Sequence, residues 1–257
     1  MPYVLLCELC VKTIVNMLIK TRGIVFRHLK YSETSVITDI FTEEVGLVTF
    51  LVNGVRTPKA KISANLLQVC SLVDVVAYHQ PEKTMQRIKE IQAGYIYSSL
   101  PFDVHKSAIG MFMLEVARRT IREQEANQPL FQYLWDVFTF LDAEKSAYAN
   151  LHLSFLTHLS YYLGFMPTDD AGRTGIVFDM KEGVFLENAG NQYLMSMQMT
   201  PIFRGLLRYD WRESYQISGI TRETRRLMLQ DLLTFYRLQI ENFPEIQSFK
   251  IYQEIFD

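Results

Sequence analysis

Ser-Val-Ile-Thr-Asp-Ile-Phe-Thr at residues 35–42, Glu-Glu-Val-Gly at 43–46 and Leu-Val-Thr-Phe-Leu-Val at 47–52 form the stretch that decides the fold. Residues 36, 38 and 40 fall on one face of an extended chain and residues 37, 39 and 41 on the other, which is the period of a β-strand. Gly46 can adopt positive φ and reverse the chain. The stretch therefore predicts a β-hairpin.

Further strands are predicted on both sides of this hairpin. Ile19–Arg27 precedes it, and Gly23 inside that run indicates a bulge or a sharp bend. Residues 66–78 and 85–93 follow it with the same β-rich character. Five strands in about 75 residues fit a small closed or partly open barrel of the OB type. We expect this barrel over residues 19–93.

Beyond Tyr95 the apolar period changes from 2 to 3.6, which indicates helices. Apolar stripes recur over 109–121 and over 131–141, the second after Pro129, which suits a first helical turn. Residues 151–163 are apolar on nearly every side and should form the central, most buried helix.

The remaining segments complete a helical domain over residues 94–257. Helices are expected over 195–209 and 221–241, and a small inserted β-hairpin within 165–192. The predicted fold class is α+β multidomain, with a five-stranded OB-type β-barrel followed by an all-α helical domain that carries the inserted hairpin.

The composition is that of a globular chain of 257 residues, with 49% apolar and 21% charged residues. No apolar run reaches the roughly 20 residues of a bilayer-spanning helix, so we expect no membrane association. Three cysteines do not make a disulfide framework and favour a reducing, cytoplasmic setting. Residues 1–18 look like an N-terminal extension without signal-peptide features, and Met17 is a candidate for the natural start.

Basic residues are concentrated in the predicted barrel. Residues 19–66 hold seven basic and four acidic side chains, a local charge of +3 in a chain with net charge −2. OB barrels hold single strands through cations and stacking aromatic rings, and Phe26 and Tyr31 interleave with these cations. A solvated face and core packing of Phe26 are the structural alternatives. The candidate phosphate-binding residues are Lys20, Arg22, Arg27, Lys30, Arg56, Lys59 and Lys61.

A second basic group lies on the predicted helix at 105–122, opposite its apolar stripe. A solvated face is the common outcome for such a group. The alternative is a site for an acidic peptide tail, which arginine-rich surfaces bind. The candidate residues are Lys106, Arg118, Arg119 and Arg122, and Arg222, Arg225 and Arg226 support the same argument more weakly.

No catalytic or nucleotide-binding motif is present. Cys7 and Cys10 have the spacing of half a zinc site, but no second pair of ligands follows. His152 and His158 are six residues apart, which does not place them side by side on a helix. We therefore expect a protein that is not an enzyme, with no catalytic residues, no metal and no cofactor.

Several segments, in this order and spacing, resemble the bacterial RecO family of recombination mediators and DNA repair proteins. The first group is Ile19-Lys-Thr-Arg-Gly-Ile-Val, Tyr31-Ser-Glu-Thr-Ser, Phe41-Thr-Glu-Glu-Val-Gly-Leu and Asn53-Gly-Val-Arg. Later segments include Arg87-Ile-Lys-Glu, Ser99-Leu-Pro-Phe-Asp and Leu163-Gly-Phe-Met-Pro. The resemblance covers the chain from about residue 17 to its end.

The resemblance implies an N-terminal OB domain and a helical C-terminal domain. It implies binding of single- and double-stranded DNA, strand annealing, and partnership with RecR in loading the RecA recombinase on DNA coated by single-strand DNA-binding protein (SSB). It further implies that the acidic C-terminal tail of SSB binds the helical domain. Many relatives carry a four-cysteine zinc element in the insert, whereas residues 165–192 here contain no cysteine or histidine.

The functional hypothesis is a non-enzymatic DNA-binding mediator that is cytoplasmic and nucleoid-associated. The alternative is a protein-interaction adaptor whose OB barrel does not bind nucleic acid. The two differ in salt dependence, because phosphate contacts release counterions and adaptor contacts need not.

Overall fold

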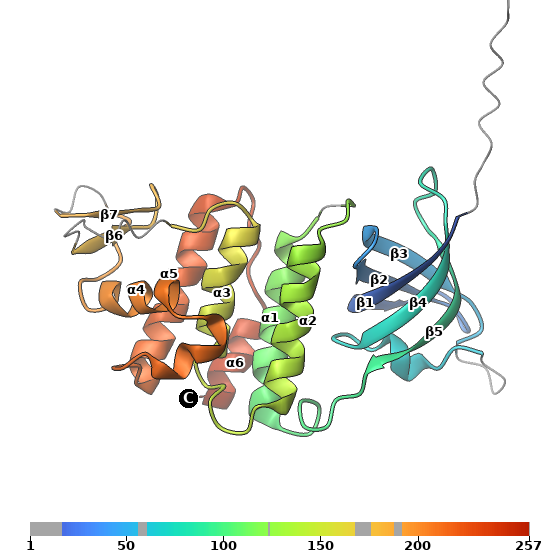
Figure 1. The fold of residues 1–257 in the computed structure, drawn as a ribbon, viewed down its shortest axis with the longest axis horizontal. Coiled ribbons are helices and arrows are strands. Elements are labelled where there is room, and N and C mark those ends of the chain that lie inside the picture. Colours follow the sequence, from blue (N-terminus) through green and yellow to red (C-terminus); the bar gives the residue numbers. More distant parts are fainter. Residues whose placement is uncertain (1–16, 56–60, 123, 168–175, 188–191, 257) are drawn as a thin grey trace, which may run out of the picture.

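The computed structural model describes residues 17–55, 61–122, 124–167, 176–187 and 192–256 (Figure 1). A five-stranded antiparallel sheet lies at one end of the molecule and a group of helices at the other. The predicted fold class is confirmed. None of the described helices is both long and apolar enough to span a bilayer.

The sheet has the strand order β3-β2-β1-β4-β5. Its long first strand pairs with β2 through its second half and with β4 through its first half, and Gly23 is paired on both sides, with Thr42 and Val73. A Cβ on Gly23 would lie 2.5 Å from the Ile40 Cγ2 atom, so glycine is required where the two ladders overlap. The strands are β1 Met17–Lys30, β2 Val36–Thr42, β3 Gly46–Val52, β4 Leu72–His79 and β5 Arg87–Tyr95.

The sheet curls without closing into a complete barrel. Opposite edges meet at one parallel bridge between Phe50 of β3 and Gln86, which precedes β5. The Leu51 N–H donates to the Gln86 carbonyl at 3.0 Å, and the Gln86 N–H donates to the Thr49 carbonyl at 2.9 Å. The partly open form of the predicted barrel is therefore the one observed.

The fourth strand starts later than predicted. Residues 66–71 were expected to be extended, but Ala64–Leu67 forms a 3₁₀ turn, η1, capped by the Ser63 side chain. Cys70 then adopts φ of 73°, which reverses the chain before β4 begins. Left-handed backbone is incompatible with a continuous strand, so the apolar residues of this segment are buried without strand geometry.

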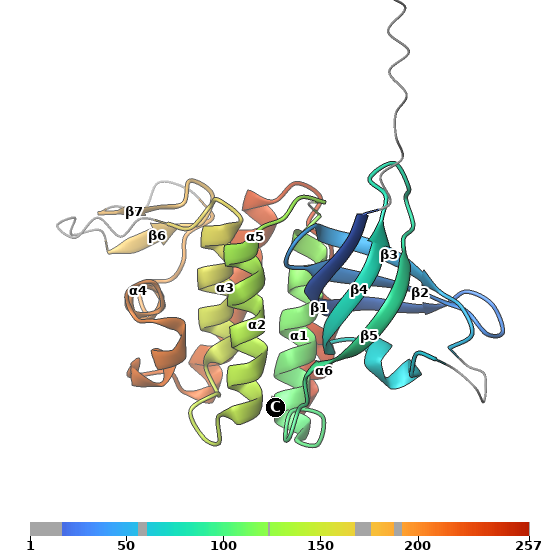
Figure 2. The ribbon, with the colours of Figure 1, turned by 45° about the vertical axis from the view of Figure 1, so that its right-hand side comes forward.

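Both faces of the curled sheet are buried near its centre, but in two separate cores. Val25, Val73 and Val75 belong to the core enclosed by the sheet. Ile24 and Phe26, on the other face of β1, belong to the core of the helical region. Figure 2 shows α1 and α2 beside this face. Phe26 is 1% exposed, which confirms core packing as its role.

The helical region is built around α3. This helix contacts α1, α2, α4 and α5, and its predicted central position is confirmed. The short helix α6 was not predicted, although it packs along α1. The helices are α1 Val104–Thr120, α2 Gln128–Ala143, α3 Leu151–Tyr162, α4 Thr200–Arg208, η2 Trp211–Gln216, α5 Arg222–Gln239 and α6 Ser248–Phe256.

The insert forms the predicted two-stranded hairpin, β6 Val177–Asp179 and β7 Val184–Leu186. Phe178 anchors it, with its ring 5.0 Å from that of Phe185 and 4.8 Å from that of Phe203 on α4. Within the described ranges, no group of three His, Cys, Asp or Glu side chains is placed to hold a metal ion. The ring of Phe178 and two hydrogen bonds from the Gln239 side chain of α5 to the Met180 and Lys181 carbonyls attach this hairpin to the helices.

Candidate nucleic-acid and partner interfaces

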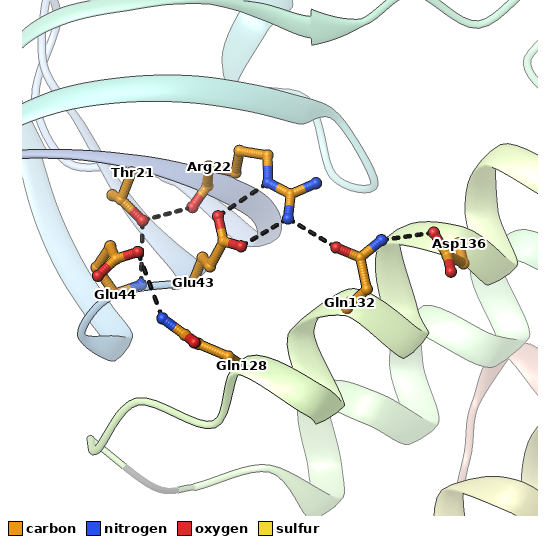
Figure 3. A network of polar contacts seen from close by, with 7 residues as sticks. All are labelled: Thr21, Arg22, Glu43, Glu44, Gln128, Gln132 and Asp136. Atoms are coloured by element: carbon orange, nitrogen blue, oxygen red, sulfur yellow. Dashed lines mark hydrogen bonds and ion pairs between the residues drawn. The ribbon is translucent and has the colours of Figure 1, made fainter.

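Arg22, one of the predicted phosphate-binding residues, lies at the contact between the sheet and α2 (Figure 3). Its Nε donates to Glu43 Oε2 at 2.9 Å, and its Nη2 donates to Glu43 Oε1 at 2.6 Å. The same Nη2 donates to Gln132 Oε1 on α2 at 2.7 Å. The guanidinium is thus held by partners from both parts of the molecule.

Aromatic rings complete this setting. The Arg22 guanidinium carbon lies 4.9 Å from the Trp135 ring centroid and 5.3 Å from that of Phe131. Hydrogen bonding to Glu43 raises the pKa of Arg22, and the reciprocal bond lowers the pKa of Glu43. Arg22 was predicted to bind phosphate, but the structure places it at the junction of the sheet and α2, where Glu43 pairs with its charge.

Arg27 is also paired. Its Nε lies 2.5 Å from Asp39 Oδ2, and the other oxygen of that carboxylate accepts from the Thr49 hydroxyl at 2.8 Å. Lys20 is exposed on a different part of β1, beside a shallow hollow that it lines with Asp74 and Glu90. Arg22, Arg27 and Lys20 therefore each lie close to carboxylates, and Arg27 is also near enough to Arg118 to lower the pKa of that arginine.

Two of the predicted cations remain exposed at what we call the loop end of the sheet, where β1 ends and the chain leaves β3. Lys30 ends β1, and Lys61 lies in the connection that leaves β3. Tyr31 is 62% exposed between β1 and β2. No described residue forms an ion pair with either lysine. Arg56 and Lys59, also predicted, lie outside the described residues.

Lys106 is buried rather than exposed on α1, at 4% exposure. Its ammonium donates to the Ser99 hydroxyl at 2.7 Å and to the Asp142 carbonyl at 2.8 Å. It also lies 5.3 Å from the ring centroid of Tyr148. The expectation that Lys106 shares a partner surface with the α1 arginines is corrected, because this lysine anchors the chain before α1 to the end of α2.

Arg118 and Arg119 do lie together, beside an open groove of about 260 Å³. The groove is formed where α1, the sheet and the start of α6 meet. Its floor is largely apolar, and its lining residues are Phe26, Val69, Met111, Leu114, Glu115, Arg118, Arg119, Gln247 and Ser248. Arg122 is exposed beyond the end of α1 and does not line the groove.

The groove carries positive charge that the described residues only partly neutralise. Burial, and then the adjacent Arg119, lower the pKa of Arg118, and no described carboxylate lies within ion-pair distance of its guanidinium. Arg119 lies 3.8 Å from Glu115, and its Nε has no hydrogen-bond partner. Glu115 accepts from the Ser248 N–H at 2.7 Å and hydroxyl at 2.6 Å, which fixes the start of α6.

The sequence did not predict the apolar residues of this groove, or the residues at the start of α6 that line it. Gln247 and Ser248 precede or begin a helix that was not predicted, and Phe26 was considered only as a stacking ring or a core residue. Apolar residues at 249, 252 and 256 carry a helical period that could have revealed α6. The interdomain position of the groove could not be read from that period.

Comparisons with known proteins agree over almost the whole chain. The family described as Recombination protein O N terminal matches residues 17–97, and Recombination protein O C terminal matches residues 101–245. A DNA repair protein RecO of Bacteroides fragilis is 37% identical over 244 residues, covering 94% of this chain and 100% of that protein. Proteins of the same name from Christiangramia forsetii and Phocaeicola vulgatus are 35% and 34% identical, each covering 93% of this chain and 100% of the relative.

Proposed function

The chain belongs to the RecO family of DNA repair and recombination proteins, and from this premise and the site geometry we propose that it is a non-enzymatic recombination mediator. In this proposal it binds single- and double-stranded DNA and anneals complementary strands. It acts in the cytoplasm, at the nucleoid. With RecR as its partner, it helps to load RecA on SSB-coated DNA.

The observation that carries the proposal is the groove beside Arg118 and Arg119. An apolar floor with two guanidinium groups at its side matches a peptide that combines carboxylates with an apolar end. The acidic tail of SSB has this chemistry, and the groove is the site that we assign to it. Neither Lys106 nor Arg122 belongs to this assignment.

DNA binding is assigned to the loop end of the sheet. Lys30 and Lys61 are exposed cations without a carboxylate partner among the described residues, and Tyr31 offers an exposed ring for base stacking. Arg22 and Arg27 are excluded from the assignment because carboxylates neutralise them. Binding through phosphate contacts should be sequence-tolerant and salt-dependent.

The DNA assignment is tested by salt titration of oligonucleotide binding with a Lys30→Gln, Lys61→Gln variant. Each single-strand phosphate contact contributes about 0.7 to the slope of log Kobs against log salt, so the slope should fall by about 1.4. A Lys145→Gln, Lys181→Gln control removes the same charge from exposed positions elsewhere and should keep the wild-type slope. A flat salt dependence of the wild-type protein would instead favour the adaptor.

The groove is tested with a synthetic peptide of four aspartates followed by phenylalanine, with a free C-terminal carboxylate. Arg118→Gln should weaken binding about 10- to 100-fold, because hydrogen bonds to charged groups are worth about 1.5–3 kcal/mol. Arg122→Gln removes the same charge from a position outside the groove and should bind like wild type. Equal weakening by both variants would mean a diffuse charge effect and would remove the assignment.

A further inference from the structure

A second arginine cluster lies at the start of α5, away from the groove of Arg118. Thr221 caps this helix, and its hydroxyl accepts from the Thr224 N–H at 3.2 Å. The first two turns face the end of α6 across a narrow notch. The residues that line the notch are Arg222, Arg225, Arg226, Tyr252, Gln253 and Phe256.

The charge of this notch is uncompensated within the described residues. No carboxylate there forms an ion pair with any of the three arginines, and Arg225 and Arg226 are half-buried. The amino end of a helix already carries partial positive charge, and cations at that end are unfavourable. Arg222 and Arg226 make no hydrogen bond or ion pair with a described residue, so no stabilising contact among those residues explains their placement at this helix end.

The walls of the notch are fixed before any ligand arrives. Arg225 Nε donates to Asn150 Oδ1 at 2.9 Å, and the Asn150 amide in turn donates to the Ser214 carbonyl at 3.3 Å. The opposite wall is Tyr252, which is 4% exposed and stacks on Phe256 with ring centroids 4.5 Å apart. The buried Asn150 therefore holds the Arg225 side chain at the notch.

The groups that the structure places directly behind the notch are Tyr252 and His152. The Tyr252 hydroxyl is 2.9 Å from Nε2 of His152, a fully buried histidine whose Nδ1 has no partner. Burial and the nearby Arg225 lower the pKa of His152 to about 3, so this ring is neutral at physiological pH. Neither group is an anion, and Glu223, the acidic residue of the first turn, forms no ion pair with the three arginines, so an external anion would balance the cluster.

We infer that this notch binds a phosphodiester group of DNA and so extends the DNA path from the sheet onto the helical domain. The inference rests on the proposed function, of which it names a second contact. Guanidinium groups match phosphate oxygens in a planar, two-point geometry. The free volume of only about 20 Å³ holds about one water-sized group, so a ligand would meet the notch through a small anionic group. The groove of Arg118, at about 260 Å³, is the one with room for a peptide.

The test is an Arg222→Gln, Arg226→Gln variant in the full chain, assayed by salt titration with a single-stranded 30-mer. No hydrogen bond within the described residues depends on either side chain, and losing two cations from a helix start should leave the melting temperature unchanged or raise it. Arg225→Gln is a second variant, which also tests the support from Asn150. The Lys145→Gln, Lys181→Gln variant is the charge-matched control.

The double variant should lower the salt slope by about 1.4 and weaken binding roughly 25-fold at 0.1 M salt, with the control unchanged. A variant slope equal to wild type overturns the notch but leaves DNA binding at Lys30 and Lys61 intact. Wild-type protein that does not bind the 30-mer overturns the proposed function as well. The inference would also be overturned if the notch variant lost affinity for the acidic test peptide but not for DNA.

Discussion

The Arg22 guanidinium and the Glu43 carboxylate form a two-point ion pair at the place where the sheet meets α2. Arg22 comes from β1 and Glu43 from the turn between β2 and β3, and Gln132 on the helix accepts from the same guanidinium. Gln132 then donates to Asp136 at 2.6 Å, and Asp136 pairs with Arg212 of η2 at 3.1 Å. One chain of polar contacts therefore runs from the sheet across α2.

We expect Arg22→Lys to reduce the free energy of unfolding by about 1–3 kcal/mol. An ammonium keeps the charge but loses the two-point geometry and the planar contact with Trp135. Urea unfolding measures the change. Lys20→Ala on the same strand is the matched control and should stay within about 0.5 kcal/mol of wild type, since that side chain is exposed. Equal stability of wild type and Arg22→Lys would contradict the junction role.

The hairpin at 35–52 and the helical stripes could be predicted because their signals are local. Strand alternation and helical period are properties of neighbouring residues, and both survive in the structure. The later start of β4 depends on the left-handed backbone of Cys70. This conformation is uncommon for cysteine, so the sequence does not predict it. Similarly, α6 is fixed by Glu115, more than a hundred residues earlier.

The positions of the cations were harder to predict for the same reason. Arg22 is neutralised by Glu43 and contacts Gln132, and Lys106 is buried by contacts with residues near 142. A basic residue looks the same in sequence whether its partner is a phosphate or a distant carboxylate. Among the described residues Lys20, Lys30 and Lys61 remain as exposed barrel candidates, and Lys20 lies beside Asp74 and Glu90. Arg118 and Arg119 line one groove.

The connection between the sheet and α1 depends on Asp142, and we expect Asp142→Asn to cost about 2–4 kcal/mol of unfolding free energy. This buried carboxylate accepts from the backbone N–H groups of Ser98 at 2.9 Å, Ser99 at 2.8 Å and Leu100 at 2.7 Å. An amide offers one acceptor oxygen instead of two. Urea unfolding at neutral pH measures the loss.

The same carboxylate predicts an acid-sensitive step. Burial alone would raise the pKa of Asp142, but hydrogen bonds from Ser98, Leu100 and Ser99 outweigh it and hold the pKa well below its usual value. The stability it provides is present above the unfolded-state pKa of about 4 and is lost as pH falls below that value. The unfolding free energy of Asp142→Asn should therefore change less than that of wild type between about pH 4 and pH 2. Parallel curves would show that another group controls this window.

His152 predicts a second loss of stability on acidification, which begins at a higher pH than that of Asp142. Burial lowers its pKa to about 3, whereas an unfolded histidine titrates near 6.5, so the stability gained from keeping it neutral is lost progressively below about pH 6.5. At pH 5 this amounts to about 2 kcal/mol. His152→Gln should flatten the wild-type curve between about pH 6.5 and pH 5, measured by urea unfolding. An unchanged slope would mean that the pKa of His152 is the same in the folded and the unfolded protein.

Cys70 should resist alkylation in the folded protein. It is 5% exposed, its Sγ lies 3.7 Å from the Tyr97 hydroxyl, and burial raises the pKa of the thiol to about 12. Only the thiolate is nucleophilic, and at pH 8 about one molecule in ten thousand would carry it. Iodoacetamide at pH 8 should leave Cys70 unmodified in buffer but label it in urea, where Cys7 and Cys10 provide reference rates in the same mass spectrum. Labelling in buffer at the rate seen in urea would show that the turn before β4 opens readily, and that the buried thiol does not hold it closed.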